Sequence, residues 1–252
     1  MRYFIEVSYD GTAFHGSQIQ EGQYTVQGTL NQALSTLLRR PVTTFGASRT
    51  DEGVHALCNF YHFDEEQPVQ DQLTYKLNAI LPSALSVTNI YTSTKEEANA
   101  RFDAVSRRYR YRIYRRKNPF LYQRAMHYPF RLDRQVLDQT AAILKEYTHF
   151  ETFSKRNTQS RTFTCTIFKS AWETQGDELH FVVEANRFLR GMVRGLVGTQ
   201  LQAARGRFDV ARFREIIEAA DCTKADFSVP GHGLYLEQVN YPEGYLLLCP
   251  QR

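Results

Sequence analysis

The first hundred residues alternate between stretches with the two-residue period of a strand and stretches with the spacing of a helix. Strand-like patterns fill residues 2–11, 42–48, 58–63 and 85–93, and helical patterns fill residues 25–40 and 70–81. Thr25 has the side chain of an N-cap, and Pro41 and Pro82 end the two predicted helices. The order strand, helix, strand, strand, helix, strand predicts a ferredoxin-like split βαβ unit.

The second part of the chain repeats this kind of pattern. Strands are predicted over residues 107–115, 161–173, 178–187 and 233–241, and helices over residues 134–147, 188–206 and 209–220. In the first of these strands Tyr109 and Tyr111 share one face and arginines occupy the other. Tyr111 is expected to be an aromatic residue of the core, as most strand tyrosines are. Asp209 is the predicted N-cap of the last helix. We therefore predict an α+β fold of two related halves, residues 1–105 and 106–252, with antiparallel sheets flanked by helices.

Composition sets broad limits on the class of protein. The chain has 252 residues, 42% of them hydrophobic, which is enough for two domains with buried cores. No apolar run approaches the about 20 residues of a membrane-spanning helix. The alternating N-terminus, with Glu6 and Asp10, does not resemble a signal peptide. Because the four cysteines and seven histidines are scattered, we expect no metal site and a reducing, cytoplasmic location.

Positive charge is concentrated in two segments, although the net charge is only +4. Residues 101–134 contain 11 basic and two acidic residues, and residues 187–214 contain seven arginines and one acidic residue. Most of the basic residues are arginine, whose planar fork suits phosphate groups. The two segments indicate a polyanionic partner, with nucleic acid as the first candidate. The alternative is that they are solvated faces of a strand and a helix.

A polar loop, residues 48–53 (SRTDEG), precedes an apolar stretch and carries Arg49 and Asp51. A lone aspartate in such a loop is usually a turn residue. Hydrolysis of a glycosidic bond normally uses two carboxylates, and Glu52 would point away from Asp51 in an extended segment. A metal-dependent nuclease would need grouped carboxylates, which the sequence does not show. If Asp51 is catalytic, we expect it to be the only carboxylate of its site.

The segment SRTDEGVHA resembles the signature loop of the TruA family of tRNA pseudouridine synthases. Four further segments are similar to family segments in the same order: VSYDGTAFHGSQIQ, ARFDAVSRRYRYRIY, FLRGMVRGLVG and GHGLYLEQVNY. The resemblance runs from about residue 3 to residue 241. It implies the pseudouridine synthase fold with a central cleft. It also implies isomerisation of uridine to pseudouridine in the anticodon stem-loop of tRNA, at positions 38 to 40, without a cofactor.

The resemblance assigns roles to five residues. Asp51 matches the catalytic aspartate, either as a nucleophile at C1′ or as the group that helps to form a glycal. Arg49 matches an arginine that fills the space left by the flipped base, with a phosphate contact as the alternative. Tyr109 matches a tyrosine that stacks on uracil and is a candidate for removing the C5 proton, with a core aromatic as the alternative. Arg194 matches an arginine paired with the catalytic carboxylate, and Leu234 matches an apolar residue of the pocket floor.

Some positions depart from the family pattern and bear on substrate choice. Ser17 stands where the family usually has tryptophan, Ser48 where glycine is common and Glu52 where alanine is common. Gly191 and Gly195 replace bulkier or polar residues. The family also forms homodimers in which one tRNA contacts both subunits, so the two arginine-rich segments would line a shared cleft. The alternatives are a non-catalytic RNA-binding protein or tRNA-folding helper on the same fold, a family member acting on other RNA uridines, and an RNA hydrolase.

Overall fold

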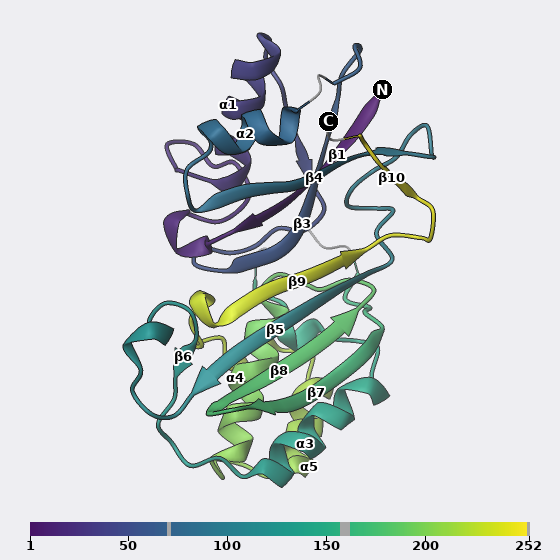
Figure 1. Cartoon of the computed structure of the whole chain (residues 1–252). Helices are drawn as coiled ribbons and strands as arrows, with labels where there is room; N and C mark the ends of the chain where they lie inside the picture. Colours follow the sequence, from purple (N-terminus) through teal and green to yellow (C-terminus); the bar gives the residue numbers. More distant parts are fainter. Residues whose placement is uncertain (70–71, 157–161, 251–252) are drawn as a thin grey trace. The chain divides into compact units, whose positions relative to one another are not determined.

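A computed structural model of the chain describes residues 1–69, 72–156 and 162–250 (Figure 1). The chain forms two compact units. The first unit consists of Met1–Val105 together with Leu236–Arg252, and the second consists of Ser106–Tyr235. The last segment of the chain, which we expected in the second half, belongs to the first unit in the structure. Both units combine helices with mostly antiparallel strands, as the α+β prediction requires.

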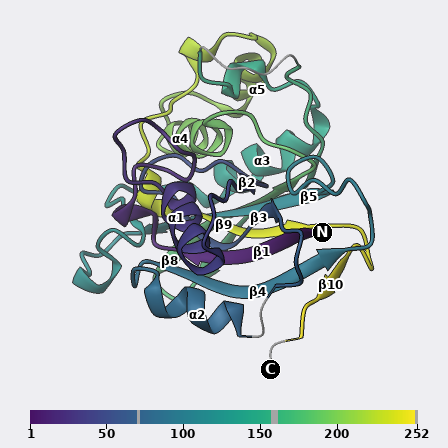
Figure 2. The same ribbon diagram turned by 90° about the horizontal axis from the view of Figure 1, so that it is seen from above.

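The sheet of the first unit has the strand order β10-β4-β1-β3-β9, and β2 pairs with β3. Its strands are β1 (Arg2–Tyr9), β2 (Phe45–Gly46), β3 (His55–Asp64), β4 (Leu85–Ser93), β9 (Leu234–Asn240) and β10 (Leu246–Leu248). Its helices are α1 (Val26–Leu38) and α2 (Leu73–Ile80). The strand β1 lies between β3 and β4 and is antiparallel to both (Figure 2). The order β4-β1-β3-β2 agrees with the predicted ferredoxin-like arrangement.

One face of β1 is buried along its length, and on the other face Phe4 is buried by tyrosines of the C-terminal segment. Phe4 is fully buried and lies edge-on to Tyr241 and Tyr245, with ring centroids 5.7 and 6.0 Å apart. These two tyrosines stack on each other at 5.3 Å. The Tyr241 hydroxyl donates to the Ala100 carbonyl oxygen at 2.6 Å. This aromatic layer explains why the end of the chain belongs to the first unit.

The short strand β2 is the largest difference from the predicted elements of the first unit. We predicted a strand over residues 42–48, but only two residues pair with β3. The Val42 N–H donates to Ser35 Oγ at 2.9 Å, and the Thr44 N–H donates to Asn31 Oδ1 at 3.0 Å. Backbone groups that bond to side chains of α1 are not available for a strand ladder. The sheet therefore has only a short contact here.

The predicted helices of the first unit are present. Thr25 Oγ1 accepts a hydrogen bond from the Gly28 N–H at 3.3 Å, which confirms the predicted N-cap of α1. The first two residues of the second predicted helix, 70 and 71, lie outside the described residues. The helix α2 begins at Leu73.

The second unit contains the antiparallel strands β7-β8-β5, and β6 pairs with β5 in parallel. Its strands are β5 (Ser106–Tyr114), β6 (Met126–His127), β7 (Ile167–Gln175) and β8 (Glu178–Ala185). Its helices are α3 (Arg134–Ile143), α4 (Met192–Ala204) and α5 (Val210–Glu218). The helix α3 packs against β7, α4 and α5. The predicted N-cap of α5 is confirmed, because Asp209 Oδ1 accepts from the Arg212 N–H at 2.8 Å.

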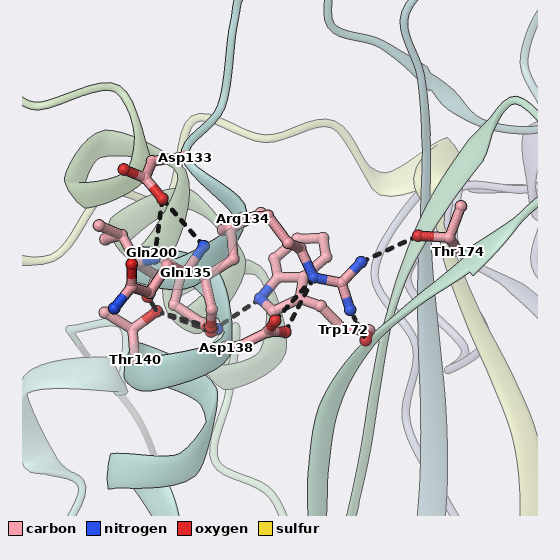
Figure 3. Close-up of polar contacts among 10 residues, drawn as sticks. Asp133, Arg134, Gln135, Asp138, Thr140, Trp172, Thr174 and Gln200 are labelled. Carbon is pink, nitrogen blue, oxygen red and sulfur yellow. Dashed lines mark hydrogen bonds and ion pairs between the residues drawn. The ribbon is translucent and has the colours of Figure 1, made fainter.

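A buried glutamine joins α3, β7 and α4 (Figure 3). Gln200 on α4 is fully buried, and its Oε1 accepts from Trp172 Nε1 at 3.0 Å and from Thr140 Oγ1 at 3.4 Å. Arg134, at the start of α3, donates to the Trp172 carbonyl oxygen at 2.6 Å and to Thr174 Oγ1 at 2.9 Å. These contacts fix α3 against the sheet and place α4 beside it.

Two predicted elements of the second unit begin later than their patterns suggest. The residue at which we expected β7 to begin, 161, lies outside the described residues. Shortly before β7, the Cys165 N–H donates to the Thr148 carbonyl oxygen at 2.9 Å, so this stretch bonds to a loop. The helix α4 begins at Met192, because Gly191 has a φ angle of +74° and breaks the helical backbone before it.

Candidate functional site

Three buried side chains from separate parts of the first unit hold the polar loop. The hydroxyl groups of Tyr9 and Thr50 share a hydrogen bond of 2.9 Å. The Thr50 N–H donates to Ser17 Oγ at 2.8 Å. Asn59 Nδ2 donates to the Ser48 carbonyl oxygen at 3.0 Å. The three supporting residues are buried, so these bonds are protected from water and fix the loop backbone.

A close backbone contact fixes the end of the loop. A Cβ atom on Gly11 would lie 2.0 Å from the Val54 carbonyl oxygen, so only glycine fits there. The Gly11 N–H also donates to His55 Nδ1 at 3.2 Å. The Val54 N–H donates to the Asp51 carbonyl oxygen at 3.2 Å, and Gly53, with φ of +76°, completes the turn. The loop is therefore braced on both sides of its charged residues.

The charged side chains of the loop differ in exposure. Arg49 and Glu52 are exposed, whereas Asp51 is half-buried. Thr50, between Arg49 and Asp51, is buried. Both predicted loop residues, Arg49 and Asp51, therefore lie in the first unit, on a turn whose backbone is held on both sides. A carboxylate in such a turn can act as a nucleophile or a base, and an exposed guanidinium can stack or contact phosphate.

The residues that support the loop were not predicted as functional. Tyr9 and Asn59 lie 41 and 11 residues from the loop residues that they contact. No periodicity or spacing connects them with the loop. Ser17 attracted notice only as a departure from the family pattern, and its hydroxyl now proves to be a loop contact.

Arg194, in the second unit, lies in the first turn of α4 and is half-buried. Its Nε donates to the Val229 carbonyl oxygen at 2.8 Å, and its Nη2 donates to the Phe227 carbonyl oxygen at 3.4 Å. Two backbone acceptors from one segment therefore orient the guanidinium.

Two glycines of α4 allow that segment to approach the helix. A Cβ atom on Gly198 would lie 2.1 Å from the Asp226 carbonyl oxygen. A Cβ atom on Gly195 would lie 2.7 Å from the ring of Phe227. Gly195, which we noted as a departure from the family pattern, thus leaves the space that the ring of Phe227 occupies in this chain.

The same segment continues to Leu234 and covers Tyr111. The Tyr111 hydroxyl donates to the Pro230 carbonyl oxygen at 2.8 Å, and a Cβ atom on Gly233 would lie 2.6 Å from the Tyr111 ring. Burial raises the pKa of Tyr111 well above its usual value, and the positive charge of Arg194 partly opposes this shift. Tyr111 is fully buried, which confirms the prediction of a core residue, and Leu234 is also buried.

Tyr109 lies on β5, two residues before Tyr111 and on the same face of the strand. It is buried, and it packs edge-on against Phe188 with ring centroids 5.1 Å apart. Its backbone is opposite Val183 in the register of β5 with β8. The ring is therefore held in a fixed orientation.

The arginines on the other face of β5 are paired with acidic residues. These ion pairs are Arg108 with Glu184 (3.2 Å), Arg110 with Glu173 (3.6 Å) and Arg112 with Glu178 (2.9 Å). The acidic partners come from β7 and β8, outside the sequence window that made this segment look strongly basic. Much of the positive charge of β5 is therefore compensated within the second unit.

The positive charge after β5 is of a different kind. Residues 115–131, here called the basic segment, contain five basic residues and no acidic residue. Within it Phe120 and Tyr122 are 89% and 71% exposed. Exposed aromatic rings among cations are typical of surfaces that bind single-stranded nucleic acid. The basic segment is thus a better candidate for phosphate contacts than the paired face of β5.

Metal binding and membrane insertion were also considered on the described residues. In ranges 1–69, 72–156 and 162–250, no group of three or more His, Cys, Asp or Glu side chains could hold a metal ion. Within the same ranges, every helix is too short or too polar to cross a bilayer.

Three proteins with similar sequences carry the same name. A family model described as tRNA pseudouridine synthase matches residues 145–242. A tRNA pseudouridine synthase A of Parabacteroides distasonis is 45% identical over 244 residues, which cover 96% of both chains. Proteins of the same name are 44% identical in Bacteroides fragilis, over 96% of this chain and 97% of the relative, and 36% identical in Bacillus subtilis, over 96% and 99%.

Proposed function

Because the chain belongs to the tRNA pseudouridine synthase A family of isomerases, which convert uridine to pseudouridine, we propose that it modifies the anticodon stem-loop of tRNA with Asp51 as its single catalytic carboxylate. The target uridines are those at positions 38 to 40. The braced polar loop is the observation that supports this proposal. Hydrogen bonds to Ser48 and Thr50 fix the backbone before Asp51, while its side chain remains half-buried rather than enclosed. A fixed carboxylate avoids part of the cost of ordering the reacting groups.

The reaction needs few groups. The bond from N1 to C1′ breaks, the uracil rotates, a bond from C5 to C1′ forms, the proton on C5 leaves and N1 takes up a proton. Asp51 begins either route. It attacks C1′ to give a covalent intermediate from which C5 later displaces it, or it accepts a proton from C2′ to give a glycal and returns that proton to C2′ when C5 bonds to C1′. The isomerisation gains and loses no atoms, so no cofactor is required.

The remaining site residues receive roles from the resemblance to the family. Arg49 is exposed, and its planar guanidinium can occupy the space that the target base leaves when it flips out of the stack. Tyr109 stacks on the uracil, and its hydroxyl is the candidate acceptor of the C5 proton. Leu234 supplies an apolar floor. Arg194, whose guanidinium is oriented by two backbone carbonyls, is the proposed partner of the catalytic carboxylate.

The family resemblance also supports a cytoplasmic homodimer that binds one tRNA across both subunits. Sedimentation of the full chain measures this assembly directly. A species with twice the mass of the chain at micromolar concentration is expected, and a monomer at every concentration would contradict it.

The decisive experiment is tritium release from tRNA labelled at C5 of uridine. The wild-type protein should release tritium, and Asp51→Asn should release none while its affinity for tRNA stays within a few-fold. Glu52→Gln is the matched control, because Glu52 is the exposed neighbour of Asp51. If Glu52→Gln is as inactive as Asp51→Asn, the assignment of a single catalytic aspartate is wrong.

The target position is tested with tRNAs in which uridines 38, 39 and 40 are replaced one at a time by cytidine. Each replacement should remove one part of the tritium release. If release persists with all three replaced, the protein acts on other uridines. Tight binding without release from any tRNA would favour the non-catalytic RNA-binding alternative.

A further inference from the structure

A pocket of about 170 Å³ lies beside the polar loop, within the first unit. Its lining includes Ser17, Arg49, Tyr61 and the rings of Phe45 and Phe102. A cavity of about 150 Å³ is large enough to hold a benzene ring, so this pocket has room for one flat ring. We propose that the pocket binds a second nucleobase of the RNA, close to the target uridine in the same strand. This inference rests on the proposed function.

Two of the residues that line the pocket are exposed aromatic rings. Phe102 is 77% exposed and Phe45 is 57% exposed. The guanidinium of Arg101, which also lines the pocket, lies 5.5 Å from the centre of the Phe102 ring. Nucleobases stack on exposed rings of this kind, and a stacked base contributes about tenfold or more to affinity.

The walls of the pocket are held in place by contacts inside the first unit. The ring of Phe45 stacks on His62 with centroids 5.3 Å apart. His62 Nδ1 in turn accepts from the Ala100 N–H at 3.1 Å. Asn99 Oδ1 accepts from the Phe102 N–H at 3.2 Å and so fixes the turn that carries the second ring. The binding surface is therefore formed before any ligand arrives, which reduces the entropy lost on binding.

One wall of the pocket is formed by Tyr61, which is 2% exposed. Burial raises the pKa of Tyr61 well above its usual value, and a hydrogen bond with Ser17 partly opposes this shift, so the phenol keeps its proton. Ser17, small where the family usually has tryptophan, leaves room on this side.

The position of Arg49 limits how far the second base lies from the target. Arg49 lines the pocket and lies two residues from Asp51. Two residues span at most about 7 Å, and stacked nucleotides of one strand are about 3.4 Å apart. The occupant is therefore one or two nucleotides from the uridine at Asp51. Arg101 is then placed for a phosphate of that short stretch.

The test uses binding, so that it does not depend on turnover. An anticodon stem-loop hairpin is titrated against the protein with Asp51→Asn, alone and combined with Phe102→Ala, Phe102→Trp or Tyr75→Ala. We expect Phe102→Ala to weaken binding about tenfold and Phe102→Trp to keep it. Tyr75→Ala should have no effect, because Tyr75 is a comparably exposed ring, 72%, on α2 of the same unit.

A second series identifies the bound base. Hairpins carry a single abasic nucleotide at each position within two of the target uridine. At one position the abasic nucleotide should weaken binding to the parent protein, Asp51→Asn, about tenfold. The same nucleotide should hardly change binding to the protein that also carries Phe102→Ala. If Phe102→Ala binds as tightly as its parent, or if every abasic position weakens both proteins equally, the pocket does not bind a base.

Tritium release by the wild-type protein is scored separately on the same hairpins. If the hairpins are turned over but no abasic position has an effect on binding that depends on Phe102, this inference is wrong and the proposed function remains intact. If binding depends on Phe102 but no hairpin or tRNA is turned over, the proposed function is wrong, whereas the binding of a base in the pocket still holds.

Discussion

Tyr9 and Thr50 lie 41 residues apart in the sequence and share a buried hydrogen bond of 2.9 Å beneath the polar loop. Asn59 Nδ2 donates to the same Tyr9 hydroxyl at 3.3 Å. Burial raises the pKa of Tyr9 to about 12, so the hydroxyl is neutral at physiological pH. This single hydroxyl therefore connects β1 and β3 to the residue that precedes Asp51.

Tyr9→Phe should impair catalysis more than stability. The change removes one buried hydroxyl, which costs about 1 kcal/mol of folding free energy. Small displacements of a catalytic group can lower rates by large factors, so we expect kcat for tritium release to fall about tenfold or more with little change in KM. Tyr75→Phe, at an exposed position, is the control for the measurements of kcat and urea unfolding. An unchanged kcat would show that the hydroxyl does not position the loop.

The secondary structure could be predicted from the sequence wherever neighbouring residues decide it. Thr25 and Asp209 cap their helices as expected, because capping depends on residues only three positions apart. The alternation along β5 correctly placed Tyr111 in the core. The ends of β2 and α4 were wrong, since long-range side-chain bonds and the φ angle of Gly191 determine them.

The supports of the candidate site could not be predicted, because they are contacts between distant segments. The contacts that Arg194 makes with the carbonyls of Phe227 and Val229 depend on how closely a loop approaches a helix, which no local pattern records. The charge of β5 misled for the same reason, since Glu178 and Glu184 are distant in sequence from the arginines that they neutralise.

The salt dependence of RNA binding should distinguish the basic segment from the face of β5. Arg115 is exposed at the start of the basic segment, whereas Arg112 makes two hydrogen bonds of 2.9 Å with Glu178. Arg115→Ala should reduce the slope of log K against log salt by about one, as the loss of one phosphate contact would. Arg112→Ala should leave the slope unchanged and lower thermal stability instead. Equal slopes for both variants and the wild type would exclude Arg115 from phosphate binding.

His62 should make the first unit less stable in mild acid. Burial, with a smaller contribution from the charge of Arg2, lowers the pKa of His62 from 6.5 to about 4. Between these values the unfolded chain binds a proton that the folded chain does not, so stability falls as the pH drops from about 6.5 to about 4. Solvent screening reduces the loss to about 2 kcal/mol or less, and above pH 6.5 it is absent.

Urea unfolding of the wild type and of His62→Asn, at pH 7.5 and 5, measures this contribution. The asparagine keeps an acceptor for the Ala100 N–H but does not titrate. The wild type should therefore lose more stability than His62→Asn between the two pH values. Equal losses would mean that His62 is protonated in the folded protein.

The two glycines of α4 should respond differently to alanine, because different atoms occupy the space that a Cβ would need. At Gly198 the obstacle is the backbone oxygen of Asp226, 2.1 Å away, which cannot move without displacing the segment that orients Arg194. At Gly195 it is the ring of Phe227, 2.7 Å away, which can turn aside. Alanine also favours a helix by up to about 1 kcal/mol over glycine at both positions, so this difference cancels in the comparison.

Gly198→Ala should therefore lower the melting temperature more than Gly195→Ala and reduce tritium release more strongly. A thermal unfolding series with both single variants and the wild type measures the first effect, and kcat measures the second. Because the segment carries the two carbonyls that hold Arg194, the loss of activity in Gly198→Ala should resemble that of Arg194→Gln. If Gly198→Ala melts with the wild type and remains fully active, the close approach of the segment to α4 does not position Arg194.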